Sequence, residues 1–159
     1  MAGSKDAFRC DPLTDPAHQA LKEFFGYDAF RAGQLDAIET ALAGRDSVVL
    51  MPTGGGKSIC YQIPPLINGG CTVVVSPLIA LMQDQVTSLD QLGLAAASLN
   101  SAMSGAAQRD AIERLQAGTL KLIYLAPERL LQPDTLAIIK QCAISLIAID
   151  EAHCVSQWG

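Results

Sequence analysis

The stretch SVVLMPTGGGKS, residues 47–58, joins an apolar run to three glycines, a lysine and a serine. The apolar run, Ser47 to Met51, predicts a strand that is buried on both faces of a parallel sheet. A helical pattern follows from Lys57 to Gln62. Glycines between a strand and a helix let backbone N–H groups approach an anion with no Cβ in the way. The stretch therefore predicts a phosphate-binding loop in an α/β fold.

Within this loop, consecutive backbone N–H groups are expected to converge on a phosphate at the positive end of the helix. They belong to Gly54, Gly55, Gly56, Lys57 and Ser58, and Thr53, which precedes them, is counted with the nucleotide-binding residues. We expect Lys57 to bridge the β- and γ-phosphates of ATP and the Ser58 hydroxyl to bind Mg²⁺. The longer pattern GxxxxGK[ST] would place its first glycine at Met51, so the prediction depends on TGGGKS and its context. The alternative is a tight turn that needs glycine for its geometry alone.

The rest of the chain alternates short apolar runs with helical patterns. The runs are rich in valine and isoleucine and predict strands at 72–75, 95–99, 120–125 and 144–149. Helices are expected at 15–26, 30–44, 57–62, 78–92, 104–117 and 133–141. Asp15 is the expected N-cap of the first helix, and Pro64 and Pro65 should break the helix that begins at Lys57. The pattern predicts an α/β fold, a parallel sheet with helices on both faces, with its ligand at the carboxyl ends of the strands.

Composition narrows the class of protein. With 159 residues, half of them hydrophobic, the chain is long enough for one domain with its own core. No apolar run approaches the roughly 20 residues that a membrane span requires, so we expect a soluble intracellular protein with no membrane partner. The five cysteines show neither disulfide nor zinc spacing. The net charge of −5 opposes nucleic-acid binding through a broadly basic surface.

A second chemical signal is LIAIDEAH, Leu146 to His153, an apolar run that ends in two carboxylates. Asp150 is placed where a carboxylate would hold Mg²⁺ at the end of a strand, and Glu151 could orient and deprotonate an attacking water. Two adjacent carboxylates repel each other in a cleft unless a cation compensates, which favours a metal ion beside them. The alternative is a surface turn after a strand, since such turns favour aspartate.

These segments together resemble a known family. FGYDAFRAGQLDAI, MPTGGGKS, VVVSPLIALMQDQV, YLAPERL and IDEAHCVSQWG follow one another in an order similar to the first motor domain of the RecQ family of DNA helicases, within the DEAH-box type of superfamily 2. The resemblance runs from about Leu21 to Gly159. It implies a RecA-like P-loop NTPase domain that is incomplete at its C-terminus, with residues 15–159 as its N-terminal portion and residues 1–14 as a flexible lead.

The resemblance also implies how the base of ATP is held. Gln34 would make a bidentate amide contact to the adenine N6 and N7 edge, a geometry that suits glutamine. Tyr27 would stack on the base, with Phe30 and Arg31 assisting. The alternative from the residues alone is that Tyr27 and Phe30 are core aromatics and that Gln34 is a solvated helix residue.

Further residues are implied to touch single-stranded or partly duplex DNA. Ser76 would cap the helix that follows it and offer its N-terminus to a phosphate, a contact that needs little basic charge. Arg129 would contact DNA or simply pair with a neighbour such as Glu128. Gln157 and Trp158 would begin an aromatic-rich loop, in which Trp158 stacks on a base or, alternatively, anchors the core. His153, at the end of DEAH, would couple the nucleotide state to these contacts.

The family carries a second RecA-like domain with an arginine finger, which this chain lacks. We therefore expect the chain to bind nucleotide weakly and to hydrolyse little ATP by itself. The whole protein is expected to separate DNA strands with 3′ to 5′ polarity, in the cytoplasm at the nucleoid of a bacterium or in the nucleus of a eukaryote. The alternatives are a P-loop NTPase that acts on RNA or a small molecule, and a non-catalytic nucleotide-binding scaffold.

Overall fold

The computed structural model of the protein describes residues 15–51 and 56–151. The expected lead, residues 1–14, lies outside these ranges. Four parallel strands form one sheet in the order β2-β3-β1-β4. Their bounds are β1 (Cys71–Val75), β2 (Ala96–Leu99), β3 (Leu122–Leu125) and β4 (Ile144–Ile149). The α/β fold with a parallel sheet is thus confirmed, and four of the five predicted strands lie within a residue or two of their expected positions.

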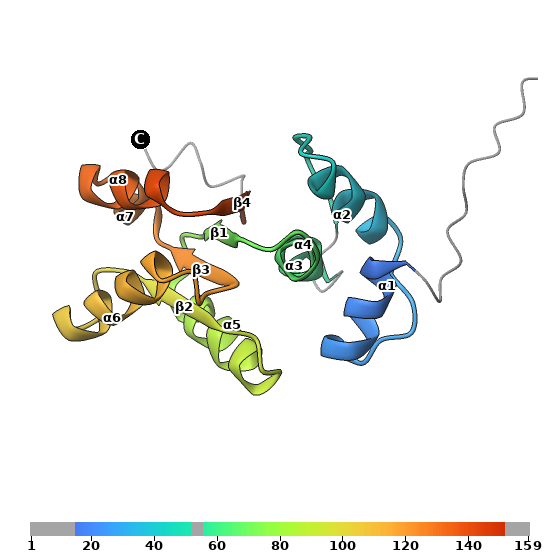
Figure 1. Ribbon diagram of the computed structural model, residues 1–159, viewed down its shortest axis with the longest axis horizontal. Helices are drawn as coiled ribbons and strands as arrows, with labels where there is room; N and C mark the ends of the chain where they lie inside the picture. The colour runs from blue at the N-terminus through green and yellow to red at the C-terminus, as the bar shows by residue number, and fades with distance from the viewer. Residues whose placement is uncertain (1–14, 52–55, 152–159) are drawn as a thin grey trace, which may run out of the picture.

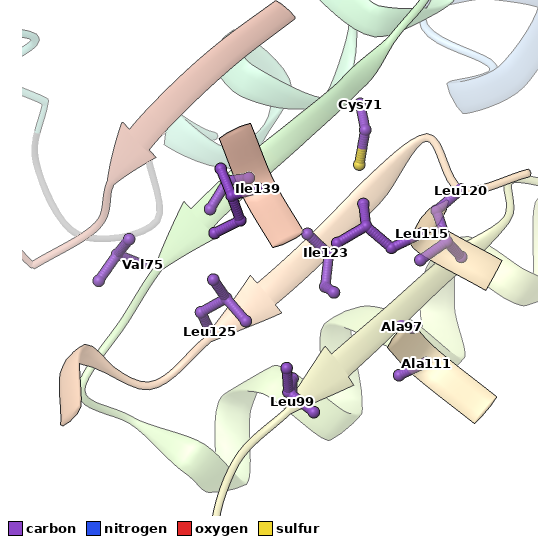
Figure 2. Packing of buried hydrophobic residues seen from close by; sticks show 11 residues of the cluster. Cys71, Val75, Ala97, Leu99, Ala111, Leu115, Leu120, Ile123, Leu125 and Ile139 are labelled. Carbon is purple, nitrogen blue, oxygen red and sulfur yellow. The ribbon is translucent and has the colours of Figure 1, made fainter. Parts of the chain in front are cut away.

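Helices cover both faces of the sheet, because alternate side chains of each buried strand point to opposite sides. On one face, α6 (Gly105–Gln116) and α8 (Pro133–Gln141) pack on Val73, Val75, Ile123 and Leu125. Figure 2 shows this layer, with Ala111 and Leu115 over β2 and Ile139 over β1 and β3. On the other face, α5 (Ile79–Gln91) packs on Val74, Leu122 and Tyr124 through Met82, Val86 and Leu89. These layers make the hydrophobic core.

A separate group of short helices precedes the sheet. Its members are α1 (Pro16–Ala20), the π-helix η1 (Leu21–Phe25), α2 (Gln34–Leu42), α3 (Lys57–Gln62) and α4 (Pro64–Asn68). They share a small core of Ala17, Ala20, Leu21, Ile38, Ile59 and Ile63. In Figure 1, α3 and α4 lie between the other helices of this group and the sheet, and both contact β1.

Several helix signals are confirmed in detail. The Asp15 side chain accepts a hydrogen bond from the N–H of Ala17, and Gly26 ends η1 with a left-handed φ of 73°. Ser104 caps α6 by accepting a bond from the N–H of Ala107 at 3.2 Å. The helix at 133–141 and the start of α3 at Lys57 stand where the sequence predicts them.

The predicted strand from Ser47 to Met51 is wrong for this structure. Residues 45–51 form no strand, and the side chains of Val48 and Leu50 are 89% and 92% exposed. An apolar segment forms a strand only when an adjacent strand offers backbone hydrogen bonds to it. None of the described strands pairs with this segment. Because segment 45–51 does not pair with it, β4 is paired only with β1 among the described strands. Its residues alternate between half-buried and exposed, and Ile147 and Ile149 are about half exposed.

Helix α3 ends at Gln62, before Pro64 and Pro65, as the sequence predicts. The two prolines then begin α4, because proline suits the first turn of a helix. Two smaller corrections concern other helices. Ser76 does not cap α5, whose N-cap is Leu78; its hydroxyl instead accepts a bond from the N–H of Leu78 at 3.3 Å. A short helix that was not expected, α7 (Pro127–Leu130), follows β3.

Candidate functional site

A hollow of about 820 Å³ lies beside β4 and its carboxyl end. Part of its wall is the extended segment 45–51, and another part is β4 with Asp150 and Glu151. Lys57, Cys60 and Tyr61 of α3 also line it. The two chemical signals of the sequence, the lysine of the glycine loop and the two carboxylates, therefore line one cavity.

The end of the glycine loop meets this hollow at Lys57, which follows Gly56. Gly56 is the N-cap of α3 and has a left-handed φ of 75°, a conformation that glycine adopts without cost. Lys57 is the first residue of the helix and is half-buried. A charged lysine and the free N–H groups at a helix start are suited to hold an anion. Thr53, Gly54 and Gly55 lie outside the described residues.

Gln34 is held against the end of this loop. Its Nε2 donates to the carbonyl oxygen of Gly56 at 2.9 Å, and its Oε1 accepts from the N–H of Arg31 at 2.7 Å. The side chain is only 4% exposed, so the alternative of a solvated helix residue is wrong. Each amide atom keeps capacity for one more hydrogen bond. A contact to adenine remains a prediction that this geometry permits.

The aromatic residues of this segment divide between surface and core. Tyr27 is 57% exposed, so it is not a core aromatic. Phe30 is half-buried against the small core of the N-terminal helices and meets the ring of His18 edge-on at 4.8 Å. Arg31 is exposed. An exposed tyrosine beside the Gln34 turn is available to stack on a base, which stays a prediction.

Asp150 and Glu151 are fixed by the end of β4. The N–H of Asp150 donates to the carbonyl oxygen of Val75 at 2.9 Å, which continues the β4–β1 pairing by one residue. The Asp150 Oδ1 accepts from the N–H of Glu151 at 3.0 Å. Glu151 has a φ of 55°, the one positive φ outside glycine in the described ranges. Such a backbone is strained, and strain of this kind gathers at functional sites.

The described residues suit a magnesium ion that also binds phosphate and water better than they suit a metal ion bound entirely by protein side chains. Within residues 15–51 and 56–151 no three His, Cys, Asp or Glu side chains gather in a metal-binding group. Mg²⁺ usually takes one or two carboxylates together with phosphate oxygens and water. Asp150 on one wall of the hollow and Ser58, one residue after Lys57, would supply such a partial set, with Mg²⁺ stabilising the charge of the phosphates. Both assignments stay predictions.

One buried phenol lines the hollow, and a second packs against it. Tyr61 of α3 and Tyr124 of β3 meet edge to face with ring centroids 6.4 Å apart. Burial raises the pKa of Tyr124 to about 12, and the negative charge of Asp150 adds to this shift. The pKa of Tyr61 is raised further, by burial first and then by the neighbouring Tyr124 and Asp150. Burial also raises the pKa of the Cys60 thiol. These groups are protonated at neutral pH, so none of them is a ready nucleophile.

Tyr61 is not among the predicted site residues, although the sequence holds a signal for it. Tyr61 stands four residues after Lys57, a spacing that places two side chains on the same face of a helix. Gln62 is not predicted either; it is 4% exposed and bonded to Gln85 of α5 and Tyr124 of β3. No pattern in the chain marks that contact, because its partners lie 23 and 62 residues away.

The predicted DNA-contacting residues lie away from the hollow where the structure describes them. Ser76 is 5% exposed, and its N–H donates to the carbonyl oxygen of Leu125 at 3.0 Å. The helix it precedes has Leu78 and Leu81 41% and 51% exposed, so these two are not core residues, whereas Met82 and Val86 are buried. Arg129 donates from Nη1 to Oε1 of Gln132 at 2.7 Å. His153, Gln157 and Trp158 lie outside the described residues.

The sequence matches a known protein family. The model of the family described as DEAD/DEAH box helicase matches residues 31–159. The chain belongs to the DEAD/DEAH box helicase family. The match spans the Gln34 turn, the glycine loop and the two carboxylates, so the hollow is assembled from the segments that this family shares.

Individual relatives point to the RecQ group. The chain is 48% identical to the ATP-dependent DNA helicase RecQ of Pasteurella multocida over 93% of its length and 23% of that protein. It is 47% identical to the ATP-dependent DNA helicase RecQ of Bacillus subtilis over 90% of its length and 24% of that protein. The chain thus spans about a quarter of the length of these relatives. The resemblance to the first motor domain of RecQ helicases is confirmed.

A solved structure supports the fold. A hypothetical ATP-dependent RNA helicase from Sulfolobus tokodaii superposes with a TM-score of 0.69 at 25% sequence identity, over 91% of this chain and 43% of that one. This agrees with a RecA-like helicase domain. No helix in the described parts of the chain is long and apolar enough to cross a membrane.

Proposed function

We propose that this chain forms the nucleotide-binding part of an ATP-dependent DNA helicase that separates strands with 3′ to 5′ polarity. One observation carries the proposal: Lys57 at the start of α3 and Asp150 at the end of β4 line the same hollow. These are the two groups that phosphoryl-transfer sites use, one for the phosphates and one for the metal ion. The names of the RecQ relatives support DNA as the second substrate.

Each candidate site residue has a proposed role. Lys57 and the N–H groups at the start of α3 bind the β- and γ-phosphates. Asp150 and Ser58 hold Mg²⁺, and Glu151 orients the attacking water and accepts its proton. Gln34 and Tyr27 bind the adenine, and His153 links this site to DNA contacts at Ser76, Arg129, Gln157 and Trp158.

A binding experiment on the 159-residue chain tests the nucleotide site. Lys57→Ala should weaken the affinity for a fluorescent ATP analogue with Mg²⁺ by about 10- to 100-fold, because a hydrogen bond to a charged group contributes about 1.5–3 kcal/mol. Lys140→Ala, which removes an exposed lysine at the end of α8, is the charge-matched control. Equal affinities in the two variants and the wild type would rule out the phosphate role of Lys57.

Turnover and unwinding belong to the whole protein. We expect the 159-residue chain alone to hydrolyse ATP slowly, since the segment 45–51 leaves one wall of the hollow open to water, with Leu50 92% exposed. In the whole protein, Lys57→Ala should abolish unwinding, while Trp158→Ala should spare basal ATPase and remove its stimulation by DNA. Equal loss of both activities in Trp158→Ala would indicate that Trp158 anchors the core.

Two other functions make different predictions. An NTPase that acts on RNA, as the name of the Sulfolobus tokodaii protein indicates for that protein, would be stimulated by single-stranded RNA and not by DNA. A non-catalytic nucleotide-binding scaffold would be stabilised by millimolar Mg-ADP, since a ligand that binds only the folded state raises stability by RT ln(1 + [L]/Kd), but it would hydrolyse no ATP with either nucleic acid. Titrations with ADP, DNA and RNA that record both stability and ATP hydrolysis separate these outcomes.

A further inference from the structure

Three polar side chains join α3, α5 and β3 inside an otherwise apolar layer. Gln62, the last residue of α3, donates from Nε2 to Oε1 of Gln85 on α5 at 3.0 Å. The same nitrogen donates to the hydroxyl of Tyr124 on β3 at 3.3 Å. Gln62 and Tyr124 are 4% and 2% exposed, whereas Gln85 is half-buried. Both hydrogens of one buried amide nitrogen are therefore used to connect elements that are distant in sequence.

This polar cluster is surrounded by apolar contacts, so its hydrogen bonds can determine where α5 lies. The other contacts between α5 and this face of the sheet are apolar and come from Met82, Val86 and Leu89. Apolar contacts are not directional, so they allow a helix to shift along its axis by small amounts. A satisfied buried hydrogen-bond network accepts one arrangement only, because a shift leaves a polar group without its partner. The Gln62–Gln85 bond thus fixes α5 relative to α3.

The two helices begin at different sites. Lys57 and Gln62 are the first and last residues of α3, a helix of six residues, so a displacement at one end reaches the other directly. Tyr61 belongs both to the hollow and to the apolar layer under α5. Helix α5 begins three residues after Ser76, the predicted DNA contact. The cluster therefore connects α3, which lines the hollow through Lys57 and Tyr61, to the middle of α5.

We propose that Gln62 is a positioning residue that couples occupancy of the hollow to the position of α5. The proposal depends on the proposed function, in which the hollow binds ATP and the segment before α5 contacts single-stranded DNA. Phosphate binding at Lys57 moves α3, and the Gln62–Gln85 bond carries the movement to α5. Gln62 touches neither ligand, so its loss changes how one ligand affects the other and leaves nucleotide binding intact.

The first test measures this coupling in the 159-residue chain. The affinity for a labelled 20-nucleotide oligothymidine is measured with and without a non-hydrolysable ATP analogue and Mg²⁺, in wild type, Gln62→Leu, Gln85→Leu and the double variant. We expect the nucleotide to change wild-type DNA affinity by about fivefold or more and to change it less than about twofold in all three variants. Gln83→Leu, an exposed glutamine on the same helix, should keep the wild-type factor.

The outcomes separate this proposal from the proposed function. An unchanged coupling factor in Gln62→Leu, with nucleotide affinity retained, overturns the role of Gln62. Additive losses in the double variant also overturn it, since two residues that act through one bond give no further loss together. A wild type that binds nucleotide no better than Lys57→Ala overturns the proposed function instead.

A second measurement does not need DNA. Amide hydrogen exchange of residues 82–86 in α5 should be faster in Gln62→Leu and Gln85→Leu than in Gln83→Leu. Mg-nucleotide should slow this exchange in the wild type and in Gln83→Leu, but not in the other two variants. If exchange in α5 is the same in all variants without nucleotide, the bond does not position α5. If nucleotide slows exchange equally in wild type and Gln62→Leu, the bond does not carry the coupling. The exchange rates measured without nucleotide test whether Gln62 positions α5 even if the chain binds no nucleotide.

Discussion

Gln34 and Gly56 are joined by a hydrogen bond of 2.9 Å that ties the first residue of α2 to the end of the glycine loop. The contact requires glycine for two reasons. Gly56 has a positive φ of 75°, and a Cβ at this position would lie 2.5 Å from the Nε2 of Gln34. Gln34 therefore supports the loop that leads to Lys57 in addition to any contact it makes with a base.

This geometry predicts that Gly56→Ala destabilises the protein more than Gly44→Ala. Both glycines have a positive φ, which costs about 1–2 kcal/mol in a residue with a Cβ. Only Gly56 has a neighbour within 4 Å of the added Cβ, since Gly44 faces open space. Displacing Gln34 should cost a further amount of about 0.5–1.5 kcal/mol for each bond it loses. Urea unfolding of the two variants measures the difference.

A double variant identifies the source of that difference. In a Gln34→Ala background, Gly56→Ala should cost no more than Gly44→Ala, because the group that the Cβ meets is gone. A penalty that remains larger at position 56 would place the clash elsewhere in the loop. Nucleotide affinity should fall in Gly56→Ala as well, since the N-cap of α3 presents its N–H groups to the phosphates.

The strained backbone of Glu151 gives a second prediction. Its φ of 55° is unfavourable for every residue except glycine, by about 1–2 kcal/mol. Glu151→Gly and Glu151→Ala both remove the carboxylate, but only glycine relieves the strain. We expect Glu151→Gly to be more stable than Glu151→Ala by about 1 kcal/mol in urea unfolding. Both variants of the whole protein should bind Mg-ATP and fail to hydrolyse it; hydrolysis in either one would remove Glu151 from the reaction.

The sequence predicts those parts of this fold that depend on local signals. Asp15 and Ser104 cap helices where they were expected to, because a side-chain oxygen three or fewer residues from a free N–H needs nothing else. Lys57 and Asp150 line one hollow, because the start of a helix and the carboxyl end of a parallel strand meet at the same side of a sheet.

The remaining features depend on partners that no local pattern names. The apolar run from Ser47 to Met51 has the composition of a buried strand, but a strand forms only when an adjacent strand pairs with its backbone. Ser76 precedes a helix as a cap would, yet α5 begins three residues later and uses Leu78. The buried amides of Gln34 and Gln62 find partners 22 to 62 residues away, and only the folded structure brings them together.

The outer edge of β4 predicts self-association, because among the described residues β4 pairs only with β1. Ile147 and Ile149 of this strand are 55% and 51% exposed, and Val48 lines the same hollow with 89% exposure. Apolar edge strands pair with other chains unless a charge blocks them. Ile147→Lys should therefore keep the 159-residue chain monomeric at higher concentration in sedimentation velocity. Leu131→Lys is the control, because it adds the same charge at a residue that is 64% exposed and lies outside β4. If both variants stay monomeric to the same concentration, the effect comes from net charge and not from the edge of β4.

The buried phenols predict a loss of stability at alkaline pH. Tyrosine ionises at a pKa of about 10 in the unfolded chain, whereas burial, with the Asp150 charge adding to it, raises the pKa of Tyr124 to about 12 in the folded protein. Between these values the unfolded chain gives up its proton and the folded protein keeps it, so the free energy of unfolding falls as pH rises, by up to about 1.4 kcal/mol per pH unit for each group. Below pH 10 this contribution is fully present. Tyr61, shifted in the same direction, adds to the fall above pH 10. Cys71 adds to it from lower pH, because its thiol starts from a pKa of 9.0 and burial raises it to about 12.

Substitution of single tyrosines isolates this effect. Tyr124→Phe lowers stability at pH 8 by removing the bond to Gln62, but it should flatten the decline between pH 10 and pH 12 in urea unfolding. Tyr61 and Cys71 should keep part of the slope in that variant. Tyr27→Phe, at a tyrosine that is 57% exposed, should leave the slope as it is in the wild type. If Tyr124→Phe and Tyr27→Phe decline with pH as steeply as the wild type, Tyr124 does not hold its proton in the folded protein.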